Sequence, residues 1–128
     1  MADSTFVFTG RYAIRPPVTS AGFTSNDPMI WSELAQTVAV KSKAVIPVSL
    51  DADAAETVQL GDVANVHVLV IDADAKVIAR ITSADGSAQI VPCDFLLVKS
   101  LTVPYTALTL QRQVGIATKV RVTACEKV

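Results

Sequence analysis

The segment VHVLVIDADAKVIARITSADGSAQIVPCDFLLVKSLTVPYTALTLQRQVGIATKVRVTAC, residues Val66–Cys125, decides the fold. It consists of short apolar runs separated by residues that favour tight turns. Apolar runs of this length, broken by turn residues, predict strands and together favour an all-β fold, an antiparallel β-sandwich or jelly roll. The six predicted strands are Val66–Ile71, Lys76–Thr82, Ala88–Pro92, Asp94–Lys99, Ala107–Gln113 and Lys119–Cys125.

The first of these runs, VHVLVI at Val66–Ile71, is apolar on both faces. Both faces are therefore expected to be covered, one by the core and the other by a subunit contact or a docked arm. By contrast, Lys76–Thr82 and Lys119–Cys125 alternate charged or polar residues with apolar ones, which predicts one face in water. The acidic DADA segment, with Asp72 and Asp74, predicts a hairpin turn after the first run.

The chain before this segment divides into two parts. Residues 37–128 are expected to form the sandwich domain, with further strands within Gln36–Leu50 and Ala55–Asp62. Residues 1–36 contain several prolines and no sustained period, which predicts an extended arm. Within this arm, Asp27 as N-cap and Pro28 at the first helical position predict a short helix near 28–35.

The arm is rich in aromatic side chains, which disordered tails lack. It contains five of the seven aromatic residues of the chain: Phe6, Phe8, Tyr12, Phe23 and Trp31. We therefore expect the arm to dock, either on its own sandwich or on a neighbouring subunit.

The composition of the chain limits the kinds of binding partner that we expect. The chain has 128 residues, enough for one domain with a real core, and 51% of them are hydrophobic. Its net charge of −1 gives no reason to expect nucleic acid or an anionic membrane as a partner, and a near-neutral apolar chain favours self-association. The N-terminus lacks the pattern of a secretory signal, and no apolar stretch is long enough to cross a bilayer, so synthesis in the cytoplasm is expected.

No catalytic constellation is visible in the sequence. The single histidine, His67, lies within an apolar run, and Cys93 has no nucleophile motif around it. Pairing of His67 with Cys93 or Asp94 in the folded chain would indicate an enzyme. We instead predict no catalytic residue and no cofactor, with Cys93 and Cys125 as buried free thiols.

Acidic residues cluster in two places where turns are expected. Asp51, Asp53 and Glu56 are the better candidates for a metal site, since carboxylate oxygens are the ligands that Ca²⁺ prefers. The full calcium-loop pattern is missing, however, and turn residues are the favoured explanation of both clusters. No metal is therefore predicted.

A sugar-binding surface is the other possibility that the residues raise. Sugar rings stack on exposed aromatic side chains, and Trp31 and Tyr105 are the two candidate platforms. They are isolated in the sequence, and each of them packing against its own domain is the alternative.

Four segments together resemble small structural proteins of tailed bacteriophage virions. The resemblance extends over Ala44–Ala124 and rests on a shared pattern rather than on an invariant motif. The segments that carry it are VSL at Val48–Leu50, QLGD at Gln59–Asp62, NVHVLVIDADAKVIARI at Asn65–Ile81 and ALTLQRQVGIATKVRVTA at Ala107–Ala124. The resemblance implies a non-enzymatic virion component, either a head decoration or cement protein or a tail, collar or fibre-attachment protein, made in the host cytoplasm.

Together these observations predict a β-sandwich assembly protein. It is expected to form a homo-oligomer, such as a trimer, and to contact other virion proteins such as the major capsid or tail proteins. The arm residues Phe6, Phe8, Tyr12, Phe23 and Trp31 are the predicted interface. A carbohydrate- or receptor-binding β-sandwich module is the alternative function.

Overall fold

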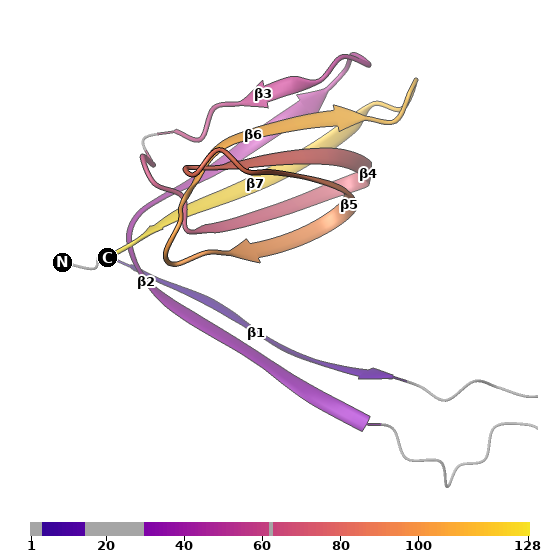
Figure 1. Cartoon of the computed structure of the whole chain (residues 1–128). Helices are drawn as coiled ribbons and strands as arrows, with labels where there is room; N and C mark the ends of the chain where they lie inside the picture. The colour runs from indigo at the N-terminus through magenta and orange to yellow at the C-terminus, as the bar shows by residue number, and fades with distance from the viewer. Residues whose placement is uncertain (1–3, 15–29, 62) are drawn as a thin grey trace, which may run out of the picture. The chain divides into compact units, whose positions relative to one another are not determined.

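The computed structural model describes residues 4–14, 30–61 and 63–128, and the side chains of all of these except 10–14 and 30–36. The described residues form an all-β protein without a helix, which confirms the all-β part of the predicted fold class (Figure 1). Its strands are β1 (Ser4–Ile14), β2 (Ile30–Leu50), β3 (Glu56–Val58), β4 (Val68–Ser83), β5 (Ala88–Lys99), β6 (Tyr105–Arg112) and β7 (Thr118–Lys127).

The chain divides into two compact units. The smaller unit, Thr5–Val38, contains most of β1 and the first part of β2, which run side by side in opposite directions (Figure 1). The larger unit contains Ala39–Val128, and within it lie the rest of β2 and strands β3 to β7. The sites described below belong to the larger unit.

Strand β4 is the centre of the larger unit. One of its edges pairs along most of its length with β5, from Val68 opposite Lys99 to Thr82 opposite Ala88. Its other edge pairs with β7 over the first half of the strand and with β6 over the second half. The register shifts between Asp72 and Val77, and such a bulge bends a strand.

The bend in β4 allows both halves of the strand to contribute to one core. Leu69 and Ile71 before the bulge, and Val77, Ala79 and Ile81 after it, all belong to the same buried cluster. The other members are Leu50, Val58, Val63, Val66, Leu108, Leu110, Val120, Val122 and Ala124. The strand order β1-β2-β7-β4-β6-β3, with β5 added beside β4, makes one curled antiparallel sheet of the described residues, rather than two separate sheets (Figure 1).

The predicted pattern of faces is confirmed only in part. Val66, Val68, Leu69 and Ile71 are buried, but Val70, on the same face as Val68, is half-buried, and that face is partly open to solvent. In the second half of β4, Val77, Ala79 and Ile81 are buried, whereas Lys76 and Arg80 are exposed. Strand β7 alternates in the same way from Thr118 to Val122, whereas Ala124, Cys125 and Glu126 near its end are all buried.

The predicted turn at Asp72 and Asp74 is wrong. Both residues lie inside β4, which continues through them to Ser83. Their exposed side chains leave the strand where the bulge interrupts the pairing with β5. The acidic residues therefore mark a bulge, in which short polar side chains are also tolerated, and the turn comes at the SADGS segment instead. There Gly86 has a φ of +89° and its N–H donates to the Ser83 carbonyl at 3.0 Å.

The predicted helix near 28–35 is also wrong over the residues that the structure describes. Residues from Ile30 onward belong to β2, which is hydrogen-bonded to β1. An isolated helix of two turns is marginal in water, whereas a strand with a partner satisfies its backbone groups. Pairing with β1 therefore overrides the local helix-start signal.

Candidate functional site

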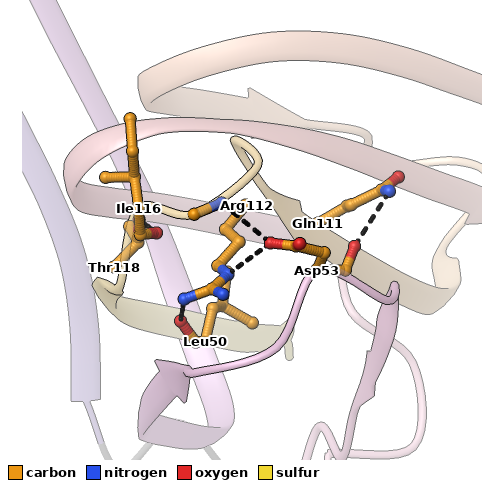
Figure 2. Close-up of polar contacts among 7 residues, drawn as sticks. Leu50, Asp53, Gln111, Arg112, Ile116 and Thr118 are labelled. Carbon is orange, nitrogen blue, oxygen red and sulfur yellow. Dashed lines mark hydrogen bonds and ion pairs between the residues drawn. The ribbon is translucent and has the colours of Figure 1, made fainter.

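Asp53, a candidate metal ligand in the sequence, instead links three segments of the larger unit. We call its contacts with Arg112 and Gly115 the latch. Its Oδ1 atom accepts hydrogen bonds from the Nε atom of Arg112 at 3.0 Å and from the backbone N–H of Gly115 at 2.9 Å. Figure 2 shows the Arg112 side chain between Asp53 and Leu50, whose carbonyl oxygen is 3.5 Å from the Nη1 atom. These contacts tie the loop after β2 to β6 and to the turn before β7.

The electrostatics of Asp53 agree with this role. The Gly115 N–H, followed by the hydrogen bond and charge of Arg112, outweighs the effect of desolvation and holds the pKa of Asp53 below its ordinary value. The backbone carbonyl of Asp53 also accepts a hydrogen bond from Gln111 Nε2 at 3.1 Å (Figure 2). One carboxylate oxygen, Oδ1, thus has two protein donors.

The other acidic candidates do not join Asp53 in a ligand set. Among the described residues, no group of three or more His, Cys, Asp or Glu side chains is placed to hold a metal ion. Asp51 is exposed and Glu56 lies on β3. Asp74 instead accepts the backbone N–H of Lys119 at 2.9 Å.

Asp72 and Asp74 line a shallow groove of about 360 Å³ beside the bulge of β4. The groove is open and carries both signs of charge, because Lys119 and Arg121 lie opposite the two carboxylates. The remaining lining residues are Pro47, Ala73 and Val120. Such a mixed lining selects no single class of ligand.

The structure separates His67 from Cys93. His67 precedes β4 and its carbonyl accepts the N–H of Ser100, just after β5, at 2.8 Å. Cys93 lies opposite Val77, seven residues earlier along β5, which is about 20 Å of extended chain. His67 is therefore not paired with Cys93, and Asp94, adjacent to Cys93, is remote from His67 for the same reason.

Both cysteines are free thiols. Cys125 is buried and Cys93 is half-buried against the core. Burial raises the pKa of both thiols, and the charge of Asp94 adds to the effect at Cys93. A raised pKa keeps a thiol protonated and makes it a poor nucleophile.

Of the two aromatic residues predicted as candidate platforms for a sugar ring, only Tyr105 has its side chain in the described part of the structure. Tyr105 is half-buried against the core cluster, and this burial raises the pKa of its phenol. It therefore packs against its own domain, which is the alternative to an exposed platform. Trp31 is the second residue of β2, but its side chain lies outside the described residues.

The predicted arm residues are described only in part. Phe6 and Phe8 are half-buried and share one face of β1, while Val7 between them is 59% exposed. Tyr12 belongs to β1, but its side chain lies outside the described part, and Phe23 lies outside it altogether. The interface role of these five residues stays a prediction.

An exposed apolar surface on the larger unit was not predicted. Directly opposed residues of antiparallel strands share a face. By this register Val45, Thr123, Val70 and Leu97 form one row across β2, β7, β4 and β5. The next row along the strands ends on β5 at Phe95, opposite Asp72. We call Val45, Val70, Phe95 and Leu97 the outer patch.

Two residues of the outer patch are exposed to solvent. Val45 is 61% exposed and Phe95 is 51% exposed, whereas Val70 and Leu97 are half-buried. Further along the same two strands, Ile78 is exposed opposite Pro92, and Ile90 is exposed opposite Arg80. Apolar side chains thus continue along the outer side of β4 and β5.

Strand β5 adds a free edge to this apolar surface. It pairs with β4, and no other described strand pairs with its second edge. None of its twelve residues is fully buried. A long apolar edge of this kind presents backbone N–H and C=O groups on which another strand can pair.

One apolar run in the sequence indicates this surface. Phe95, Leu96, Leu97 and Val98 are four consecutive apolar residues, so both faces of that strand must be apolar. Leu96 and Val98 pack on the core, which leaves Phe95 and Leu97 on the outer face.

Comparisons with protein-family models, with curated proteins and with solved structures found no match for this chain. Within the described residues, no helix is long and apolar enough to cross a membrane.

Proposed function

We propose that this chain is a non-enzymatic structural protein that assembles with copies of itself through the outer patch and the free edge of β5. The observation that carries this proposal is the exposure of Val45 and Phe95 on neighbouring rows of one sheet face. Exposed apolar side chains that gather on one sheet face favour a protein partner.

The energetics favour covering this surface. Removing apolar area from water is favourable by roughly 25 cal/mol per Å². Phe95 and Val45 keep more than half of their surface in water in the isolated chain, and Ile90 is 66% exposed. Interfaces that form permanently resemble a protein core, and these side chains supply the apolar part of such an interface.

The edge of β5 supports the same proposal in a different way. Pairing with a strand of a second copy would satisfy backbone groups that now face solvent. Pro92 has no N–H and interrupts the edge at one point, which favours the half of β5 from Asp94 onward as the pairing segment. Phe95 and Leu97 lie in that half.

The setting that we propose is a phage virion. The chain would serve there as a head decoration or cement protein, or as a tail or collar protein, in contact with the major capsid or tail proteins. The resemblance of Ala44–Ala124 to small virion proteins supports this setting. In it the predicted interface residues of the arm would add contacts to neighbouring subunits.

Hydrogen exchange at two protein concentrations locates the proposed contact. Amides of Asp94–Lys99 are expected to gain protection as the concentration rises, because assembly covers the edge of β5. Amides of the turn Gln113–Ala117 serve as the control, since this turn lies outside the patch. Equal protection at both concentrations, in a sample that is assembled at the higher one, would place the interface elsewhere.

The virion setting has its own test. Mass spectrometry of purified particles of the virus that encodes this chain is expected to detect its peptides in many copies per particle. Particles that lack the chain would contradict the virion proposal but leave self-assembly standing.

A further inference from the structure

His67 occupies a buried position where three segments meet. Its side chain is only 7% exposed. Its backbone N–H donates to the Cys125 carbonyl at 2.8 Å, and its carbonyl accepts the Ser100 N–H at 2.8 Å. Its ring nitrogen Nδ1 accepts the backbone N–H of Lys127 at 3.2 Å. The ring thus holds the last residues of β7.

The hydrogen bond from Lys127 requires a neutral ring. An imidazole nitrogen accepts a hydrogen bond only through its lone pair, and both nitrogens of an imidazolium are donors. Protonation of Nδ1 therefore replaces an attraction with two N–H groups that face each other. The Lys127 N–H, at the end of a buried strand, would then lose its partner.

Four strands near His67 carry charged and titratable groups, and two of these groups, Glu126 and Lys127, act electrostatically on the ring. Glu126 and Lys127 come from β7, and Lys99 from β5. Lys41 and Lys43 come from β2, and Tyr105 from β6 through its bridge to Val66. Burial lowers the pKa of His67 and the charge of Lys127 lowers it further, while Glu126 and a hydrogen bond with the Asn65 backbone act in the opposite direction.

We propose that His67 is an acid-sensitive lock on the end of β7, closed when Nδ1 accepts the Lys127 N–H and open when that nitrogen is protonated. The same end of the strand also holds β2, because the Val128 N–H donates to the Ala39 carbonyl at 3.0 Å. Loss of the hydrogen bond between His67 and Lys127 therefore also weakens the attachment of β2 at Ala39. The larger unit begins along β2 at this residue.

Amide exchange and ring titration of the full-length protein test this lock together. The ring ¹⁵N shifts of His67 report its protonation, and the exchange rate of the Lys127 amide, corrected for its intrinsic pH dependence, reports the hydrogen bond. The pKa of His67 is lowered, so its ring takes up a proton only below the ordinary histidine pKa. As the pH falls from about 7.5 until the ring ¹⁵N shifts show a protonated His67, the Lys127 amide is expected to lose protection about tenfold. The amide of buried Leu108 is the internal control and should keep its protection.

Two substitutions separate the chemistry of the ring from its shape. His67→Asn places a carbonyl oxygen near the position of Nδ1 and does not titrate, so the Lys127 amide should stay protected throughout this pH range. His67→Phe fills similar space without an acceptor, so the amide should exchange fast throughout it. Unchanged protection of Lys127 in the wild-type protein while the ring becomes protonated would overturn the proposal. A ring that stays neutral until the whole protein unfolds would overturn it as well, and these wild-type results stand even if a variant does not fold.

Discussion

The Nε atom of Arg112 lies 3.0 Å from Oδ1 of Asp53 and closes the loop after β2 onto β6. Because the same oxygen accepts the Gly115 N–H, Asp53→Ala removes two contacts at once. We expect this variant to melt at a lower temperature than the wild-type protein by circular dichroism. High salt should shrink the difference only in part, since it screens the ion pair but leaves the hydrogen bonds.

Asp51→Ala is the matched control for the latch. Asp51 carries the same charge in the same loop and is exposed. Its removal should leave the melting temperature unchanged. Equal effects of the two substitutions would show that the charge of the loop, rather than the contacts of Asp53, determines stability.

A substitution at Leu110 tests whether this residue lies in the packed core. It is fully buried in β6, between Ala79 of β4 and Glu56 of β3. Leu110→Ala should lower the free energy of unfolding by about 2–5 kcal/mol, because it leaves a cavity in a packed cluster. Urea denaturation measures the change. Val114→Ala, at a residue that is 83% exposed, should change stability by less than about 0.5 kcal/mol.

Gly61 tests a close approach between the loop after β3 and strand β2. It has a φ of +68°, and a Cβ atom there would lie 3.1 Å from the Cβ atom of Ala44. Gly86 has a φ of +89° but open space around it. Both Gly→Ala substitutions should cost about 1–2 kcal/mol for the left-handed backbone, and Gly61→Ala should cost more because Ala44 must move. In a double-mutant cycle, Ala44→Gly should recover that excess, and additive effects would exclude the contact.

Glu126 gives the protein a second response to acid. Burial would raise the pKa of its carboxyl, but hydrogen bonds from Asn65 and Ser42 and the charge of Lys41 outweigh burial and lower it. The unfolded chain, with a pKa near 4.5, therefore takes up this proton first as the pH falls. The stabilisation by the carboxylate is present above about pH 4.5 and is lost below it.

Urea denaturation of Glu126→Gln and the wild-type protein at several pH values measures this effect. The wild-type protein should be the more stable one near neutral pH, and the difference should shrink as the pH falls below 4.5. Glu56→Gln removes the same charge elsewhere and is the control. A difference that does not depend on pH would show that the ionised carboxylate contributes nothing.

Local patterns in the sequence predict the strands well. The alternation of Val77, Ala79 and Ile81 with polar residues identifies a one-sided strand, and the SADGS turn with Gly86 at positive φ ends it. The DADA segment misleads because Asp favours turns and is also tolerated at an exposed bulge. Asp27 and Pro28 mislead because a two-residue helix-start signal carries no information about the strand partner of the residues that follow.

The candidate sites were harder to predict because they depend on register. Nothing local in the sequence places Asp53 beside Arg112, which is 59 positions away, or Val45 in a row with Leu97. The latch also needs a short acidic side chain in a loop, which resembles a metal ligand when the sequence is read alone. For the outer patch, the apolar run from Phe95 to Val98 was an available signal, but only the pairing with β4 shows which of its members face outward.

The solution mass of the full-length protein tests self-assembly through the outer patch most directly. Light scattering should give a multiple of the 13.5 kDa chain mass for the wild-type protein. The double substitution Val45→Ser, Phe95→Ser should reduce the mass toward that of one chain, while Val114→Ser, an equally apolar exposed site outside the patch, should leave it unchanged. A wild-type protein that stays at 13.5 kDa over the whole concentration range, or an assembly that the double substitution leaves intact, would contradict the account.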